Sequence, residues 1–285
     1  MGKNAAAAPT DLSLHARVIG TGPRQLVLLH GFAASRHTWD NLIPLIPLAA
    51  YTLHLLDLKG HGTSPQPAYS DYSLHEQARL VAAYLENQRL DEVTLIGHSM
   101  GGAVALLTAL DCDCLARLVL IGCPGYLQTM PRFMAMLALP YVGPLFLTLA
   151  PARLVARKGL KAAFFRPERI SAALIEGYAN GYRTLTAARA LAATVRQLVP
   201  ADHAALVASY GRIAIPTLLL WGAHDRIVKR WQGEQLQRDL AAARLVVIPD
   251  CGHNPHEELP RETWLAMRPF LEGALLPIDK INPAC

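Results

Sequence analysis

The sequence predicts an α/β fold: a mostly parallel, doubly wound sheet of about eight strands that carries an inserted helical cap. Two observations predict it. In both halves of the chain, short apolar runs alternate with helical stretches, which is typical of a parallel sheet covered by helices on both faces. Between the halves the strand pattern stops, and residues 124–210 are rich in Leu, Ala and Met. We therefore expect residues 1–123 and 211–285 to form the core and residues 124–210 to form the cap, or lid.

The elements of the core follow one another in a regular order. The first half begins with a weakly alternating edge strand, and the runs after it are continuously apolar, as buried strands are. Helices with one apolar face separate several of these strands. The expected strands are 12–19, 25–29, 51–58, 92–96, 115–121, 215–220 and 245–248, and the expected core helices are 74–90, 103–110, 231–240 and 261–271.

The composition is that of a globular chain. Hydrophobic residues make up 52% and charged residues 17% of the 285 positions, which excludes a disordered or fibrous protein. The net charge of +5 is not gathered into a basic stripe interleaved with aromatic residues, so we expect no nucleic-acid partner. No group of His, Cys, Asp or Glu has metal-ligand spacing and no Gly-rich phosphate loop occurs. We therefore expect no metal and no cofactor.

Three features predict a cytoplasmic protein. Residues 1–8 lack the apolar run of a signal peptide, and Ala6 stands where a myristoylation signal needs Ser or Thr. The five cysteines form no disulfide framework, because Cys112 and Cys114 are too close for an ordinary bridge. Residues 133–152 carry no charge and reach the length of a membrane span, but three prolines and Gly143 interrupt them, which favours a buried or lid-forming helical pair.

One motif carries the chemistry. The expected strand at 92–96 runs directly into Gly97-His98-Ser99-Met100-Gly101-Gly102, and a helix follows. A G-x-S-x-G sequence between a strand and a helix is the pattern of a nucleophile elbow, in which side chains at the two glycines would crowd the strained turn. A serine hydroxyl becomes a useful nucleophile only when a base within hydrogen-bond reach removes its proton. The sequence must therefore supply that base elsewhere.

Several segments together resemble the α/β-hydrolase superfamily. They are His30-Gly31-Phe32, Asp57 to Ser64, Gly97 to Gly102, Gly222-Ala223-His224-Asp225 and Gly252-His253, and they span the core on both sides of the expected cap. In that family the nucleophile, the acid and the histidine follow in this chain order. The resemblance implies that Ser99 is the nucleophile, His253 its base and Asp225 the residue that orients the base. Each follows an expected strand, where sites form at the carboxyl edge of a parallel sheet.

A second carboxylate and two further histidines compete for roles. Asp250 is the alternative acid, but it lies on the same short loop as His253, whereas Asp225 closes a different strand. His98 and His61 are more often structural than catalytic in this family.

The resemblance also implies an oxyanion hole. Two main-chain N–H groups supply it in the family: that of the residue after the nucleophile and that of the residue after the His-Gly turn, here Met100 and Phe32. The side chains of both residues are expected to serve as pocket wall.

The function expected from the resemblance is that of a carboxylic-ester hydrolase that cleaves small to medium hydrophobic esters through an acyl-enzyme. A Ser at the elbow argues against the haloalkane dehalogenase and epoxide hydrolase branches, which place Asp there. A carbon–carbon bond hydrolase of aromatic ring-cleavage products stays open; it shares the triad but often has Asn where this chain has His98. Amidase, thioesterase, lactonase and perhydrolase activities also stay open, as does a ligand-binding receptor built on this fold.

The cap sequence suggests what the substrate is like. Its first part is rich in apolar side chains that form either an adaptable pocket wall or the packing of cap on core. A basic run with one acidic residue, Glu168, follows, and it is either a solvated helix face or an attractor of anionic substrates or lipid. We expect hydrophobic acyl esters as substrates and transient contact with lipid interfaces. The apolar residues are Phe133, Met134, Met136, Leu137, Leu139, Tyr141, Val142, Leu145 and Phe146, and the basic ones are Arg153, Arg157, Lys158, Lys161, Arg166 and Arg169.

Overall fold

A computed structural model describes residues 13–68, 70–130 and 132–273. Within these residues, seven strands form one central sheet in the order β1-β3-β2-β4-β5-β6-β7. Among these seven described strands, only the edge strand β1 is antiparallel to its neighbour; the other neighbouring pairs are parallel. The mostly parallel sheet is confirmed, with seven strands among the described residues. The strands are β1 Ala16–Ile19, β2 Arg24–Leu29, β3 Tyr51–Leu56, β4 Val93–His98, β5 Leu115–Ile121, β6 Thr217–Gly222 and β7 Ala243–Ile248.

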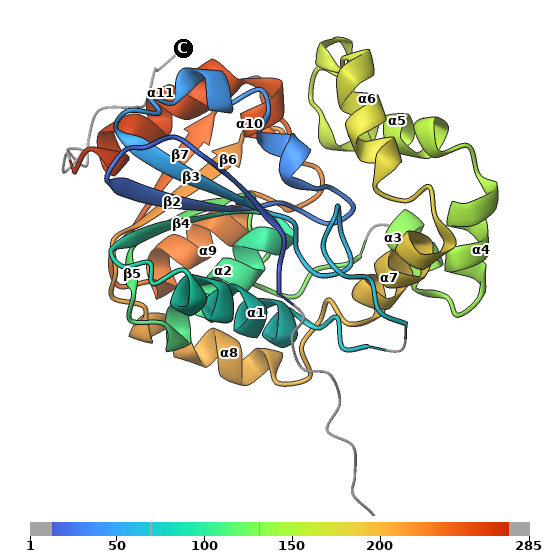
Figure 1. Ribbon diagram of the computed structural model, residues 1–285, viewed down its shortest axis with the longest axis horizontal. Helices are drawn as coiled ribbons and strands as arrows, with labels where there is room; N and C mark the ends of the chain where they lie inside the picture. Colours follow the sequence, from blue (N-terminus) through green and yellow to red (C-terminus); the bar gives the residue numbers. More distant parts are fainter. Residues whose placement is uncertain (1–12, 69, 131, 274–285) are drawn as a thin grey trace, which may run out of the picture.

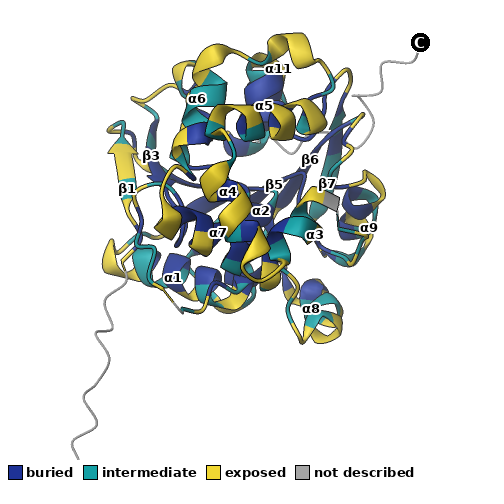
Figure 2. Cartoon of the chain, turned by 90° about the vertical axis from the view of Figure 1, so that its right-hand side faces the viewer, coloured by how far each residue is buried: buried dark blue, intermediate teal, exposed yellow. Residues whose placement is uncertain are grey.

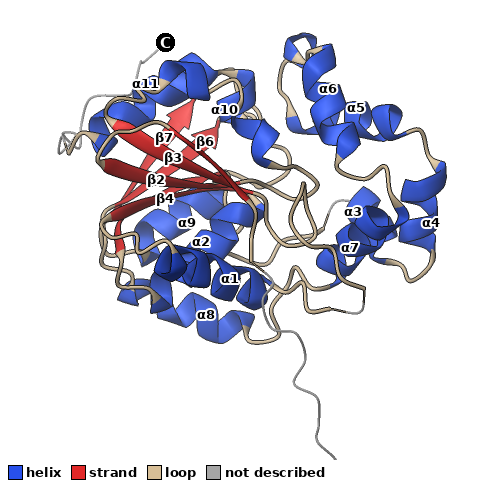
Figure 3. Cartoon of the chain, viewed as in Figure 1, coloured by secondary structure: helices blue, strands red, loops and turns tan. Residues whose placement is uncertain are grey.

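Helices cover both faces of the sheet, which explains why the central strands are apolar without alternation (Figure 1, Figure 3). On β2, Val27 and Leu29 pack toward α1 and α2, while Leu26 and Leu28 pack toward α11 on the opposite face. The side chains of successive residues thus enter two separate cores. The helices of the core are α1 Leu74–Asn87, α2 Met100–Asp111, α9 Trp231–Asp239, α10 Pro255–Glu258 and α11 Pro260–Leu271.

Between β5 and β6 the regular elements of the described residues are all helical. α3 to α7 lie beyond the carboxyl ends of the parallel strands, away from the sheet, whereas α8 lies under the sheet near α1 (Figure 1). α3 to α7 bury an apolar cluster of their own that includes Leu137, Leu147 and Leu191. The helices are α3 Arg132–Ala138, α4 Val142–Leu149, α5 Ala152–Ala163, α6 Ala172–Asn180, α7 Leu185–Arg196 and α8 His203–Ser209.

The uncharged stretch 133–152 forms the two short helices α3 and α4 and the start of α5. Among the residues that the structure describes, no helix combines the length and hydropathy needed to cross a membrane. Cys112, Cys114, Cys123 and Cys251 are free thiols. The expectations for residues 1–8 and for the start of the edge strand at Leu12 lie outside the described residues, as does the fifth cysteine.

Candidate active site

The turn at Ser99 is tightly constrained. Ser99 follows β4 and precedes α2, with φ 51° and ψ −119°. A non-glycine residue held at such angles costs about 1–3 kcal/mol and persists only when its surroundings impose it. The two flanking glycines impose it through contact: a Cβ at Gly97 would lie 2.3 Å from the Gly101 carbonyl oxygen, and a Cβ at Gly101 would lie 2.5 Å from that of His30. The strand–turn–helix context expected for the motif is therefore present.

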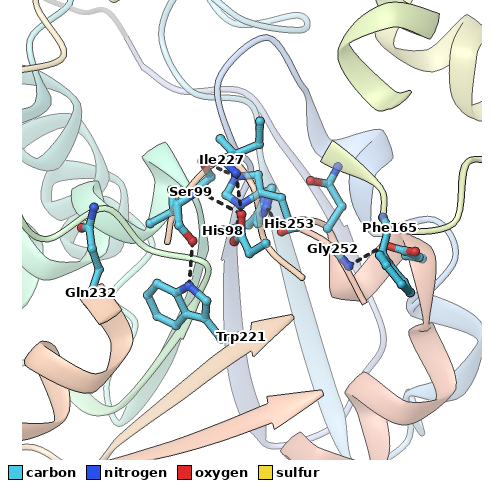
Figure 4. Close-up of polar contacts among 12 residues, drawn as sticks. His98, Ser99, Phe165, Trp221, Ile227, Gln232, Gly252 and His253 are labelled. Atoms are coloured by element: carbon cyan, nitrogen blue, oxygen red, sulfur yellow. Dashed lines mark hydrogen bonds and ion pairs between the residues drawn. The ribbon is translucent and has the colours of Figure 1, made fainter. Parts of the chain in front are cut away.

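Ser99, His253 and Asp225 form one hydrogen-bonded line. Figure 4 shows Ser99 next to His253. The distance from Ser99 Oγ to His253 Nε2 is 2.9 Å, and that from His253 Nδ1 to Asp225 Oδ2 is 2.8 Å. The other carboxylate oxygen, Oδ1, accepts the N–H groups of Ile227 and Val228 at 2.8 and 2.9 Å. Because an ionised carboxylate only accepts, Nδ1 of His253 carries the proton and Nε2 faces the serine with its lone pair. The three side chains come from the ends of β4, β6 and β7.

The main chain of His253 is fixed on both sides. Its N–H donates to the carbonyl oxygen of Ala163 at 2.7 Å, at the end of α5. Its carbonyl accepts from Nε2 of the buried His98 at 3.0 Å, and the two rings lie 4.9 Å apart. Burial lowers the pKa of His98 well below its usual value, so His98 is neutral and its Nε2 carries the proton. His98 thus contacts both the main chain and the ring of His253.

Asp250, the alternative acid, lies elsewhere. Its side chain is 60% exposed, and its carboxylate is 3.6 Å from the guanidinium of Arg166. The carboxylate bonded to the His253 ring is that of Asp225. Asp250 instead contributes to a surface ion pair between the β7–α10 loop and the helical segment.

Two main-chain N–H groups flank Ser99. Met100 is the first residue of α2, so its N–H has no acceptor within the helix. A Cβ at Gly31 would lie 3.2 Å from Ser99 Cβ, which shows how closely the His-Gly turn approaches the serine. No described group accepts a hydrogen bond from the Phe32 N–H. Two hydrogen bonds of the His30 ring hold this turn in place. Nδ1 donates to the Gly31 carbonyl at 2.8 Å, and Nε2 accepts from the Leu58 N–H, in the loop after β3, at 3.0 Å.

A buried polar cluster behind His253 was not identified from the sequence. Glu257 accepts hydrogen bonds from Thr38 Oγ1 at 2.7 Å and from the Tyr178 hydroxyl at 3.0 Å. Asn254, next to His253, donates to the same hydroxyl at 3.1 Å. Burial raises the pKa of Glu257 to about 7 and lowers that of His256 to about 3. Thr38 and Glu257 are separated by 219 positions, so no local pattern signals their contact.

The apolar residues expected as pocket wall divide into two groups. Leu137 is buried within the helical segment, and Met134 and Met136 pack against the same cluster. The others face outward: their exposed fractions range from 39% for Phe146 to 89% for Tyr141. An enclosed wall is therefore not their arrangement in this structure. The outward-facing residues are Phe133, Leu139, Tyr141, Val142, Leu145 and Phe146.

In the described part of the chain, no cluster of three or more His, Cys, Asp or Glu side chains is arranged to hold a metal ion.

The parallel sheet, the strained strand–turn–helix serine and the carboxylate–histidine pair at the strand ends define a hydrolase of the α/β class. Consistent with this, a family model described as the alpha/beta hydrolase family matches residues 26–265. The chain belongs to this family.

Characterised and solved relatives are spread over the family. The chain is 30% identical over 265 residues to the pimeloyl acyl-carrier-protein methyl ester esterase of Nitrosomonas europaea, covering 88% of this chain and 96% of the relative. It is 29% identical over 252 residues to a 2-hydroxy-6-oxononadienedioate/2-hydroxy-6-oxononatrienedioate hydrolase of Klebsiella pneumoniae, covering 85% of each. A thermophilic esterase from Thermogutta terrifontis has a similar fold, with a TM-score of 0.77, 24% identity and coverage of 94% and 96%.

Proposed function

We propose that this hydrolase cleaves carboxylic esters of small to medium hydrophobic substrates, with Ser99 as nucleophile, His253 as base and Asp225 as the residue that orients the base. One observation carries the proposal: the continuous line from Ser99 Oγ through the His253 ring to the Asp225 carboxylate, with separations of 2.9 and 2.8 Å. Both distances are within the reach that proton transfer requires. The ester relative named above supports the same bond type.

The proposed reaction has two steps. Ser99 Oγ attacks the ester carbonyl carbon while its proton passes to Nε2 of His253, and the alcohol leaves with that proton. Water then attacks the acyl-enzyme, gives its proton to His253, and the acid departs as Ser99 Oγ recovers the proton. Asp225 stabilises the histidine cation in both steps. The N–H groups of Phe32 and Met100 stabilise the oxyanion, and each such donor contributes roughly 3–4 kcal/mol.

We also propose that α3 to α7, within the expected cap of residues 124–210, act as the cap, whereas α8 belongs to the core, because Leu206 and Val207 pack against the core cluster. The location of α3 to α7 beyond the strand ends supports this proposal (Figure 1). Specificity for hydrophobic acyl groups would then arise between this segment and the turn at Ser99, which is only half-buried.

The test is steady-state hydrolysis of p-nitrophenyl esters from acetyl to palmitoyl chains by the wild type and by Ser99→Ala. We expect turnover in the wild type and background rates in Ser99→Ala. Ser209→Ala is the matched control, because its hydroxyl bonds only to the Leu206 carbonyl far from the site. Equal activity of wild type and Ser99→Ala would overturn the assignment of the nucleophile.

A carbon–carbon bond hydrolase is the second candidate, because the chain is 29% identical to a hydrolase of that type. It predicts turnover of ring-cleavage dienoates and inactivity toward simple esters. A receptor built on this fold predicts binding without turnover beyond one equivalent of ligand. Multiple turnovers of an ester exclude the receptor, and a comparison of the rates with the two substrate types distinguishes the enzymes.

A further inference from the structure

The outer side of α4 is unusual for a surface helix. α4 contains no charged residue, and it exposes Val142, Leu145, Phe146 and Leu149 by 49%, 58%, 39% and 74%. A helix at a protein surface normally turns polar side chains to water and only one apolar stripe to the core. The inward side of α4, with Leu147, is also apolar and is buried. The exposed residues therefore form an apolar ridge that no packing within the described chain accounts for.

This ridge suits hydrocarbon better than it suits a protein partner. The helix has one polar side chain, Thr148, and its hydroxyl already donates to the carbonyl of Pro144 at 2.8 Å. With eight residues, α4 is about 12 Å long, which alone is too short for a stable protein interface of about 1,000 Å². Hydrocarbon requires neither hydrogen bonds nor a matching shape. Tyr141, before the helix, is 89% exposed and belongs to the residue type that favours the membrane–water boundary.

Basic side chains lie beside the ridge. α5 begins three positions after the end of α4 and exposes Arg157, Lys158 and Lys161. Exposed surfaces of α4 and α5 face the same side of the molecule (Figure 2). No described carboxylate lies within 4.0 Å of these three cations. Between Asp113 and Glu168 the sequence has no acidic residue, so α4 and α5 themselves carry only positive side-chain charge.

We propose that this face is a docking surface for an anionic lipid bilayer. The α4–α5 surface consists of Leu145, Phe146 and Leu149 on α4 and Arg157, Lys158 and Lys161 on α5. The α4 ridge enters the boundary between headgroups and acyl chains, and the α5 cations lie among anionic headgroups. This combination of an apolar face and a flanking basic face is what lets a helix lie in the interface plane. The inference does not depend on the proposed chemistry.

Cosedimentation with vesicles tests the proposal on the full chain with Ser99→Ala, so that no ester is cleaved during binding. We expect the protein to sediment with phosphatidylcholine vesicles that contain phosphatidylglycerol and to stay in solution with phosphatidylcholine alone. Each cation near anionic headgroups contributes about fivefold to partitioning, so Lys158→Glu with Lys161→Glu lowers it by about 25-fold or more at low salt. Leu145→Ser with Leu149→Ser lowers it by a similar factor and also at high salt, because burial of apolar side chains is not screened.

Two matched variants control for surface hydrophobicity and charge elsewhere. Leu265→Ser removes a leucine that is 51% exposed on α11, and Arg212→Glu reverses an exposed charge outside the surface. Both should bind vesicles as the parent does, and melting temperatures should show that all variants fold. Absence of vesicle binding, or equal binding by parent and α4–α5 variants, overturns the proposal. So does a shift from dimer to monomer in Leu145→Ser with Leu149→Ser without vesicle binding, because a second copy then covers the face.

Discussion

The hydroxyl of Tyr178 donates to the carboxylate of Glu257 at 3.0 Å and joins α6 of the proposed cap to α10 of the core. The same hydroxyl accepts from Asn254, the neighbour of His253. Glu257 is buried, and its hydrogen-bond partners all donate to it. A carboxyl in this position connects the pH of the solution with the contact between cap and core.

Stability should therefore depend on pH through Glu257. Its pKa is about 7 in the folded protein and near the ordinary 4.5 when unfolded. Between these values the unfolded chain holds fewer protons, so the free energy of unfolding falls as pH rises, by an amount on the order of 1–3 kcal/mol. Glu257→Gln cannot ionise and should lose this decline. Denaturant unfolding of both proteins between about pH 5 and about pH 8 measures the difference.

Glu262→Gln on α11 is the control for that experiment. Glu262 is exposed, so this substitution removes a carboxylate that is in water rather than one that is buried. Its profile should follow the wild type. Parallel profiles for wild type and Glu257→Gln would mean that Glu257 stays ionised throughout this range.

Asp225→Asn and Asp250→Asn should differ widely in activity. In the first, an amide replaces the acceptor of the His253 Nδ1 proton, which favours the wrong tautomer and removes the charge that stabilises the cation; we expect kcat to fall by roughly 10³–10⁴. In the second, a surface ion pair with Arg166 is lost, which is worth about 0–1 kcal/mol and leaves kcat within about twofold. The measurement is steady-state kinetics on the best p-nitrophenyl ester. Similar losses in both variants would show that Asp225 has no special role.

Two glycine-to-alanine variants should change stability in opposite directions. In Gly101→Ala the new Cβ would lie 2.5 Å from the His30 carbonyl oxygen, so the turn at Ser99 must shift and both melting temperature and activity fall. In Gly159→Ala, on exposed α5, nothing lies within 4 Å of the new Cβ, and we expect a gain of about 0.5–1 kcal/mol. Thermal melting checks both. An unchanged Gly101→Ala would contradict the close approach described for the elbow.

His98 should act as a positioning residue. His98→Ala leaves the buried carbonyl of His253 without its donor, which costs about 1–3 kcal/mol and lets the His253 loop move. We expect kcat to fall more than KM rises, with a changed pH profile, since the base is displaced while the substrate pocket stays. His98→Asn keeps an N–H donor and should recover part of kcat. If His98→Ala and His98→Asn both match the wild type in kcat and pH profile, His98 is only packing.

The local parts of this fold and site could be predicted from the sequence, because their signals are local. The apolar strand runs and the glycines around Ser99 are read within a few positions, and Asp225 and His253 each follow a strand end. The contacts between distant segments could not be predicted in this way. Glu257 lies on a four-residue helix without periodicity, and its partners come from two other elements. The outward orientation of α4 likewise depends on packing, which periodicity does not specify.

The bond from the His253 N–H to the Ala163 carbonyl sets a mechanical limit on how the proposed cap opens. Movement of the end of α5 away from the core would break the hydrogen bond of the His253 N–H. It would thereby displace the proposed base as the substrate enters. Nearby, Glu258 adds to this tether by accepting the N–H groups of Phe165 and Arg166 at 3.1 and 2.8 Å. We therefore expect the end of α5 to stay in place if the proposed cap moves, and an entrance that leaves the proposed base in position to open on the side of α3 and α4.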